Sequence, residues 1–346
     1  MPAVVAAATA FPPFVATQEQ VREVARSCLP GLEESLPVFD RSRVQRRHFM
    51  RPLDWYLQPR PFAERNGIYL QEGTDLLERA ARRCLGQAGL PPERLDMVIA
   101  VSSSGFATPS LDARLISRLG RRPQTVRLPI WGLGCAAGAA GLARAADYAL
   151  GHPQAVVLVA ALECCSLTFL HDDLSKKNLI AAAIFADGAA AALVAGSQSG
   201  LCGPRLTATG SHLFPASDRV MGWDFLDRGM QLVLSPRLPA IVREQLAPLV
   251  DHFLAGSGLS RRQLVHYLTH PGGARVIDAY RQALGLTDEQ LELTEAVLRE
   301  HGNISSVSVL AVLERWLASE RCTRSGPGLL SAFGPGFSAE MVLLEV

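Results

Sequence analysis

The sequence lacks the cysteine spacing that a metal site or a disulfide framework requires. Its seven cysteines lie at irregular intervals, include the neighbouring pair Cys164 and Cys165, and form no Cys-x-x-Cys motif. No group of histidines and cysteines has the spacing of a zinc site either. We therefore expect no metal ion and no disulfide, and the free thiols are typical of the reducing cytoplasm.

An excess of charge of one sign is also lacking. The chain has 34 Lys and Arg residues against 33 Asp and Glu, a net charge of +1, which gives no electrostatic reason to expect a nucleic acid or a membrane surface as partner. The apolar run at Ile180–Val194 is interrupted by Asp187 and Gly188, so we expect no membrane span. The first ten residues lack the basic segment of a signal peptide and predict a β-strand instead.

No low-complexity linker divides the 346 residues. Hydrophobic density is lowest at Ser197–Pro204, which predicts a joint between a half 1–200 and a half 201–346. Apolar runs of strand length alternate with amphipathic runs of helical period, and this alternation indicates an α/β fold. The predicted strands lie within 1–10, Leu95–Ser102, Ala155–Leu162, Phe185–Val194, Leu264–Thr269 and Leu329–Val346, and the predicted helices are Ser110–Leu119, Ala136–Leu150, Pro239–Leu254, Arg275–Leu284 and Ser305–Ala318.

Cys135 stands between a short apolar run that ends in glycines and a stretch of small residues with helical spacing. This pattern predicts a thiol at a strand-to-helix turn, where free N–H groups and the helix dipole favour negative charge. A thiolate is the nucleophilic form of cysteine. A buried structural cysteine is the alternative interpretation, and the local string alone does not choose between them.

The same α/β unit recurs in the two halves. One strand leads to Ser103 and a later strand leads to His270; 32 positions separate Ser103 from Cys135, and 33 separate His270 from Asn303. In the same order, Phe-Ala-Asp-Gly-Ala from Phe185 matches a later Phe-Gly-Pro-Gly-Phe, each before an apolar strand. A duplicated unit predicts a pseudo-twofold axis that brings Cys135 and Asn303 to one cavity, with His270 beside them.

A thiol, an imidazole and a carboxamide at one point suit attack on an acyl carbon. The cysteine attacks, the histidine can hold the thiolate as an ion pair and later donate a hydrogen bond, and the asparagine can donate to an oxyanion but cannot act as a base. A papain-type hydrolase uses the same residue types in the same chain order. A plain helix cap for Asn303 and a core or turn position for His270 are the structural alternatives.

Four motifs together resemble the type III polyketide synthases, the chalcone-synthase-like branch of the thiolase superfamily. They are Gly-Cys-Ala-Ala-Gly around Cys135, His-Pro-Gly-Gly from His270, Gly-Asn-Ile-Ser-Ser around Asn303, and Phe-Gly-Pro-Gly-Phe-Ser-Ala-Glu-Met from Phe333. The resemblance spans nearly the whole chain and implies a five-layered αβαβα fold built from two duplicated halves. A ketoacyl synthase acting on acyl carrier protein usually has His-Gln-Ala-Asn at the histidine, and a thiolase has a second catalytic cysteine.

The resemblance also implies roles for individual residues. Cys135 carries the acyl chain, while His270 and Asn303 stabilise the enolate that forms when malonyl-CoA loses its carboxylate. Phe185 matches the gatekeeper between tunnel and cavity, and the second, normally aromatic, gatekeeper falls at Leu232, a departure that alters the cavity. Further substrate-binding residues implied by the resemblance are Cys165, Thr168, Gly273 and Thr108, of which Thr108 lies in a loop that enters the partner subunit of a homodimer. A cis peptide bond is a candidate before Pro109.

Coenzyme A enters the family's tunnel at a basic mouth. Arg41, Arg46 and Arg47 lie in the matching region and are the candidate ligands of its phosphates, although a solvated charged face is the commoner role of such a run. We expect CoA thioesters as substrates, no separate cofactor, and an acyl carrier protein as a second candidate donor of the starter.

Within the family, Leu162–Phe169 and Asp172–Asn178 resemble bacterial alkylpyrone and alkylresorcinol synthases. The resemblance favours a fatty acyl starter and a cyclised alkylpyrone or alkylresorcinol product. Three alternatives stay open: a synthase of tetrahydroxynaphthalene or phloroglucinol type that uses malonyl-CoA alone, a single-step condensing enzyme like ketoacyl-ACP synthase III, and a catalytically silent scaffold.

Overall fold

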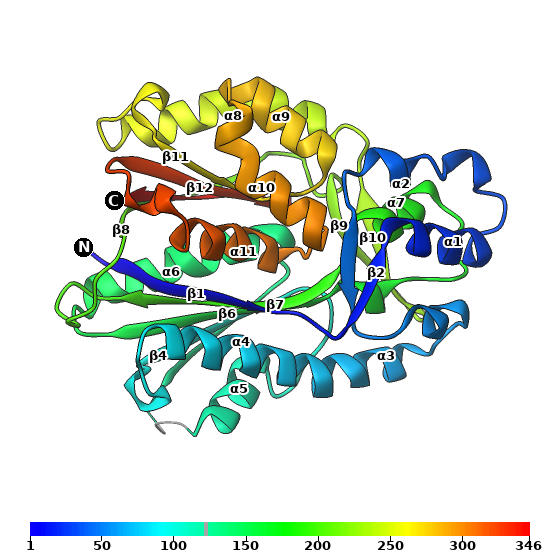
Figure 1. Ribbon diagram of the computed structural model, residues 1–346, viewed down its shortest axis with the longest axis horizontal. Helices are drawn as coiled ribbons and strands as arrows, with labels where there is room; N and C mark the ends of the chain where they lie inside the picture. The colour runs from blue at the N-terminus through cyan, green and yellow to red at the C-terminus, as the bar shows by residue number, and fades with distance from the viewer. Residues whose placement is uncertain (121–123) are drawn as a thin grey trace.

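The computed structural model describes residues 1–120 and 124–346 as alternating layers of helices and strands (Figure 1). The strands are β1 (Ala3–Ala10), β2 (Phe14–Thr17), β3 (Arg46–Phe49), β4 (Met97–Ser102), β5 (Val126–Trp131), β6 (Val156–Cys164), β7 (Asp187–Ala195), β8 (Arg205–Leu213), β9 (Met221–Leu226), β10 (Gly229–Leu234), β11 (His266–Thr269), β12 (Pro327–Gly334) and β13 (Ser338–Glu345). The helices are α1 (Gln18–Cys28), α2 (Val38–Arg41), α3 (Phe62–Ile68), α4 (Thr74–Gln87), α5 (Leu111–Leu119), α6 (Ala137–Gly151), α7 (Lys176–Ile184), α8 (Leu238–Ala255), α9 (Ala274–Leu284), α10 (Asp288–His301) and α11 (Ser306–Leu317).

Nine strands form one mixed sheet in the order β11-β12-β13-β8-β1-β7-β6-β4-β5. The sheet repeats a pattern, because β4-β6-β7-β1 and β11-β12-β13-β8 each contain one parallel pairing followed by two antiparallel pairings. The two groups meet where Ala3 of β1 pairs with Arg205 of β8. The predicted duplication is therefore present in the strand order.

Helices cover both faces of each group of strands. α4 and α5 lie outside the N-terminal strands, α6 and α11 lie between the two groups, and α8 and α9 lie outside the C-terminal strands (Figure 1). α10 lies beside the edge strand β11 and contacts both α9 and α11. Strands β6 and β7 are buried along their whole length, as expected for strands enclosed on both faces. This is the five-layered αβαβα arrangement that the resemblance implies.

The two central helices approach each other more closely than ordinary side chains allow. A Cβ atom on Gly138 of α6 would lie 2.3 Å from the carbonyl oxygen of Ser306 and 2.7 Å from Cγ1 of Val309, both on α11. The neighbouring residues of α6 are mostly alanine and glycine, whose side chains project little from the helix and let another backbone come close. The N-terminal ends of α6 and α11 consequently meet, and each begins within three residues of a predicted catalytic residue.

The elements expected from apolar periodicity form within a few residues of their predicted bounds, as for α6, α8 and β11. Sequence reasoning did not identify α1, α4, α10 or the strands β8 to β10. β8 carries Thr, Ser and His among its apolar residues, and its burial does not follow a clean period of two. None of the described helices is long and apolar enough to cross a membrane.

His301, the last residue of α10 and two residues before Asn303, stacks with the rings of Phe11 and His48. The ring centroids of Phe11 and His301 are 4.2 Å apart, and those of Phe11 and His48 are 4.7 Å apart. Burial lowers the pKa of His301 to about 4, with further lowering from Arg315 and His48. Protonation of His301 is therefore unfavourable in the folded chain.

Replacing Gly138 with alanine should destabilise the protein by about 1–3 kcal/mol, because the added methyl collides with the backbone of α11. The change is measured as a lower urea midpoint. At Gly151, the last residue of the same helix, an added Cβ would meet no atom within 4 Å, so Gly151→Ala is the matched control and should be neutral or slightly stabilising. Equal midpoints for the two variants would contradict the close packing.

His301 should make the fold sensitive to acid. Between the ordinary histidine pKa of 6.5 and about 4, the unfolded chain binds a proton that the folded chain does not, so stability falls as the pH is lowered through this window. The loss amounts to about 3 kcal/mol when the window has been crossed. Urea midpoints measured from pH 7 to pH 4 should fall less steeply in His301→Gln than in the wild type, whereas His252→Gln, on an exposed position, should follow the wild type.

Candidate active site

Cys135 lies in a short helical turn, Gly134–Ala136, between the end of β5 and the start of α6. The turn is held by a hydrogen bond from the N–H of Gly134 to Oγ of Ser103, at 2.9 Å. The thiol is buried, and its sulfur lies 4.0 Å from Oδ1 of Asn303. The strand-to-helix turn predicted from the sequence is therefore where the thiol sits.

The side chain of Asn303 is fixed by hydrogen bonds with Ser305 and Gly272. Its Oδ1 accepts a hydrogen bond from the N–H of Ser305 at 2.8 Å, and its Nδ2 donates to the carbonyl oxygen of Gly272 at 3.2 Å. Oδ1 also faces Cys135. An amide has two N–H donors, so the second N–H of Asn303 is free of protein acceptors among the described residues. Asn303 thus supports the turn before α11 and still offers a donor.

His270 follows β11 and is buried, and neither of its ring nitrogens has a partner among the described residues. Its ring lies against the loop that Asn303 holds, because a Cβ on Gly272 would be 3.5 Å from Nε2. A buried polar group without a partner is costly to the fold. Neither nitrogen of His270 would therefore have to give up a hydrogen bond within the described residues to bind another group.

Burial decides the charge of the two reactive groups. It raises the pKa of Cys135 to about 12, against the opposing effect of hydrogen bonds with Ser305 and Asn303. It lowers the pKa of His270 to about 3. The expectation that the helix start alone would favour the thiolate is corrected by this burial: the thiol and the imidazole are both neutral at pH 7.

A buried carboxyl group lies close to the thiol. Glu163, on β6, accepts hydrogen bonds from the N–H of Ser103 at 3.1 Å and from Oγ of Ser306 at 2.7 Å. Burial raises the pKa of Glu163, and its negative charge contributes to the raised pKa of Cys135. The sequence analysis did not single out Glu163, and an acidic residue within an otherwise apolar strand was the available signal.

Four of the predicted substrate-binding residues line one apolar cavity: Phe185, Cys165, Thr168 and Leu232. The cavity adjoins one predicted catalytic residue, because Phe185 pairs with Asn303 through its backbone. Sequence reasoning missed the wall that α1 supplies and several aromatic residues. These further lining residues include Val21, Val24, Ala25, Phe49, Tyr56, Trp223 and Met230.

The other two predicted substrate-binding residues lie outside this cavity. Gly273 precedes α9 with a φ of 138° and lies in the loop next to His270. Thr108 is exposed on the single chain, in a loop whose Thr108–Pro109 peptide bond is cis, as suggested from the sequence. An exposed Thr108 does not contribute to the cavity of its own chain.

The three predicted CoA ligands have different environments. Arg41 is exposed and has no ion-pair partner among the described residues, and Arg46 is 3.9 Å from Glu300. Arg47 is fully buried, and its guanidinium donates to the carbonyl oxygens of Ala182 and Phe185 at 2.7 Å each. A buried, engaged Arg47 cannot reach a phosphate in solution, and this placement corrects its assignment to CoA.

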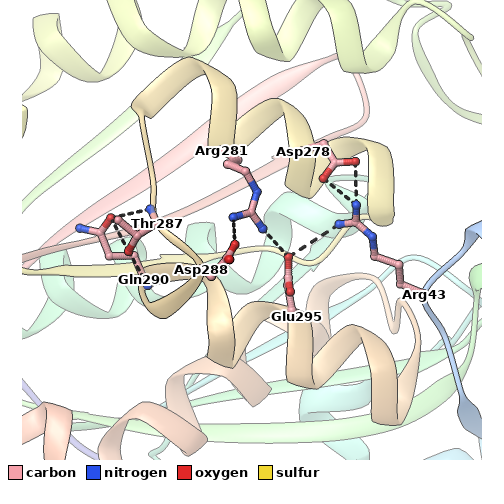
Figure 2. Close-up of polar contacts among 7 residues, drawn as sticks. All are labelled: Arg43, Asp278, Arg281, Thr287, Asp288, Gln290 and Glu295. Carbon is pink, nitrogen blue, oxygen red and sulfur yellow. Dashed lines mark hydrogen bonds and ion pairs between the residues drawn. The ribbon is translucent and has the colours of Figure 1, made fainter.

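A fourth arginine of the same run forms an ion-pair network on the surface (Figure 2). Arg43 donates to both carboxylate oxygens of Asp278 on α9, at 2.9 and 3.0 Å, and lies 3.6 Å from Glu295 on α10. Arg281 also binds Glu295, at 2.7 Å, and pairs with Asp288. The network fixes the segment after α2 to α9 and α10.

Comparison with known proteins places the geometry in context. Two family models match the chain, chalcone and stilbene synthases, N-terminal domain, over residues 57–198 and the C-terminal domain of the same family over residues 205–346. A 1,3,6,8-tetrahydroxynaphthalene synthase of Streptomyces peucetius subsp. caesius is 40% identical and is aligned over 99% of this chain and 92% of its own length. A phloroglucinol synthase of Pseudomonas fluorescens is 33% identical over 97% of this chain and 96% of its own length.

Solved structures agree with these matches. The 1,3,6,8-tetrahydroxynaphthalene synthase of Streptomyces coelicolor A3(2), described as a bacterial type III polyketide synthase, superposes with a TM-score of 0.93 at 33% identity and covers 99% of both chains. PKS-I of the brown alga Ectocarpus siliculosus superposes with a TM-score of 0.90 at 30% identity, over 99% of this chain and 98% of its own.

Proposed function

Because the chain belongs to the chalcone and stilbene synthase family, and so to the type III polyketide synthases, we propose that it extends an acyl group held on Cys135 with malonyl-CoA. Type III polyketide synthases are acyltransferases, and this chain is therefore an acyltransferase. The observation that carries the proposal is the sulfur of Cys135 at 4.0 Å from Asn303, which binds the loop of the unpartnered His270 and pairs with Phe185 in the wall of an apolar cavity.

In the loading step, Sγ of Cys135 attacks the carbonyl carbon of an acyl-CoA. Since the thiol and the imidazole start out neutral, the thiol proton passes to a free nitrogen of His270 as the carbon–sulfur bond forms. His270 returns this proton to the departing CoA sulfur. The products are the acyl thioester of Cys135 and free CoA.

In the extension step, malonyl-CoA loses carbon dioxide and leaves an enolate. The free N–H of Asn303 and the single ring N–H of neutral His270 are donors for the enolate oxygen. Hydrogen-bond donors that are already in place usually make the largest single contribution to stabilising the transition state in such sites. The enolate carbon attacks the acyl carbon, the bond from that carbon to sulfur breaks, and Cys135 leaves as a thiolate that takes up one proton from solvent to restore the resting thiol. Phe185, beside Asn303, places an apolar face where the carboxylate loses its charge.

The starter that we propose is a fatty acyl group, cyclised after extension to an alkylpyrone or an alkylresorcinol. The supporting feature is the apolar lining of the cavity, which continues from Phe185 past α7 to Val21, Val24 and Ala25 of α1. Helix α1 lies at the periphery of the molecule, beyond α7 (Figure 1). A leucine at position 232 in place of an aromatic gatekeeper leaves additional room.

A synthase that uses malonyl-CoA alone is the second candidate. The names of the relatives favour it, because they denote tetrahydroxynaphthalene and phloroglucinol products. In that reaction the starter on Cys135 also derives from malonyl-CoA, and the deep end of the cavity stays unused.

CoA phosphates are proposed to bind Arg41 and Arg46, the two exposed arginines of the predicted set. A homodimer is proposed as well. Its support is the exposed Thr108 loop, next to which the partly exposed rings of Phe106, Trp131 and Phe225 contact one another. Clustered apolar side chains on a surface are typical of interaction sites.

The two candidate reactions are separated by incubating the enzyme with malonyl-CoA, with and without acyl-CoAs of 4 to about 18 carbons, and identifying products by mass spectrometry. A fatty starter predicts alkylated products that appear only with acyl-CoA. Products that form equally well without acyl-CoA would instead support the second candidate.

Cys135→Ala should lose the covalent acyl adduct in intact-protein mass spectra, and an adduct that persists would contradict the assignment of Cys135 as the nucleophile.

Closing the deep end of the cavity should shorten the accepted starter. Ala25→Phe places a ring among the α1 residues of the lining, so a long-chain acyl-CoA should lose about tenfold or more in extension rate while a short-chain one keeps its rate. Ser27→Phe puts the same ring on the exposed side of α1 and is the control. Equal effects on long and short starters would show that the acyl chain does not occupy this end.

A further inference from the structure

The segment Arg43–Arg47, here called the strap, lies along the C-terminal part of α10. Three of its residues contact successive turns of this helix. Arg43 pairs with Glu295 (Figure 2), the N–H of Gln45 donates to the carbonyl oxygen of Arg299 at 2.8 Å, and Arg47 reaches the next turn, beyond the end of the helix. Every second residue of the strap thus contacts the next turn along α10 or, for Arg47, the residue that follows the helix.

At the end of the strap, the stem of Arg47 packs against Gly302. A Cβ on Gly302 would lie 2.7 Å from Cδ of Arg47 and 2.7 Å from the carbonyl oxygen of Ile184. The backbone angle φ of Gly302 is 71°, a value that residues with a Cβ atom rarely adopt. Only glycine allows Arg47 and Ile184 to lie this close to the residue that precedes Asn303.

The guanidinium of Arg47 continues to the helix that carries the gatekeeper. It donates to the carbonyl oxygens of Ala182 and Phe185 at 2.7 Å each, and to Oε1 of Gln18 at 2.8 Å. Ala182 lies near the end of α7, and Phe185 follows α7 directly. One buried side chain therefore holds three oxygens around the end of α7.

The backbones on the two sides of Arg47 are also joined to each other. The N–H of Asn303 donates to the carbonyl oxygen of Ile184 at 2.8 Å, and the N–H of Ala186 donates to the carbonyl oxygen of Asn303 at 3.0 Å. Arg47 thus lies behind a small backbone pairing that carries Asn303 on one strand and Phe185 on the other. Within the described residues, the side chain of Arg47 donates to Ala182, Phe185 and Gln18 and makes no hydrogen bond with Cys135 or its turn.

Keeping a cation there is costly, and burial lowers the pKa of Arg47 to about 9. The charge of Asp187 opposes this shift, yet no oxygen of Asp187 is within ion-pair distance of Arg47. A planar guanidinium directs several N–H groups at fixed angles toward separate oxygens, and the compact ammonium of lysine does not reproduce this geometry. The geometry of the bonded oxygens, rather than a salt bridge, is what Arg47 secures.

We infer that Arg47 is a positioning residue for the extension step, setting Asn303 and Phe185 relative to each other without taking part in the loading of Cys135. The inference rests on the proposed function, because it assigns Asn303 and Phe185 to the malonyl half of the reaction. It gives the buried arginine a task that the CoA assignment does not.

The test separates the two half-reactions in the full-length enzyme. Loading is measured as the rate at which an acyl-CoA forms the Cys135 adduct in a single turnover, and extension as carbon dioxide released from malonyl-CoA. In Arg47→Lys we expect loading to stay within about threefold of the wild type and carbon dioxide release to fall by about tenfold or more, since small misplacements of reacting groups have large effects on rate. Gly302→Ala displaces Arg47 from the other side and should give the same imbalance.

Arg65 offers a matched control, because it is also buried and donates to backbone carbonyl oxygens, including that of Leu167 at 2.7 Å. Arg65→Lys should lower the melting temperature but keep the ratio of loading to carbon dioxide release. If Arg47→Lys and Gly302→Ala lower both half-reactions by one common factor, as a loss of folded protein would, Arg47 is merely structural and the inference is overturned. A wild-type enzyme that neither loads nor releases carbon dioxide would refute the proposed function instead.

Discussion

The contact between α6 and α11 at Gly138 is the constraint on which the site depends. A helix surface without a side chain lets the backbone of α11 come within van der Waals distance, and this fixes where both helices begin. Cys135 lies just before one helix start and Asn303 just before the other, so the distance between the reactive sulfur and the amide is set by main-chain packing. Loops could not hold two such groups as firmly, because loops are the more mobile parts of a fold.

The same burial that orders the site keeps it uncharged. The pKa of Cys135 is raised and that of His270 is lowered, so a separated thiolate and imidazolium would both be disfavoured in the interior. In the proposed reaction, charge forms only as the acyl carbon is attacked and the thiol proton passes to His270. A neutral resting thiol also protects a buried nucleophile from side reactions, since only the thiolate is strongly nucleophilic.

The sequence was sufficient for the parts of the site that depend on chain order. Two copies of one unit predicted that the equivalent helix starts at Cys135 and Asn303 meet at the pseudo-twofold axis, with His270 beside them. It was not sufficient for Arg47, because a run of arginines is the same string whether a guanidinium faces water or the end of α7. Nor could it predict the α1 wall of the cavity, because the helical spacing of Val21, Ala25 and Cys28 indicates a buried face but does not identify the distant α7 as its neighbour.

The buried arginine also explains why the two halves of the chain must be treated as one catalytic unit. Phe185 belongs to the first half and Asn303 to the second, and the two segments are joined by only a short backbone pairing. Such a pairing is too small to be stable alone, because isolated two-stranded pieces are marginal in water. Arg47 adds hydrogen bonds on one side and packs its stem against Gly302 on the other, and the ion pairs of Arg43 fix the strap to α9 and α10 outside. The duplicated fold brings the residues together, and the strap supports the junction between Phe185 and Asn303.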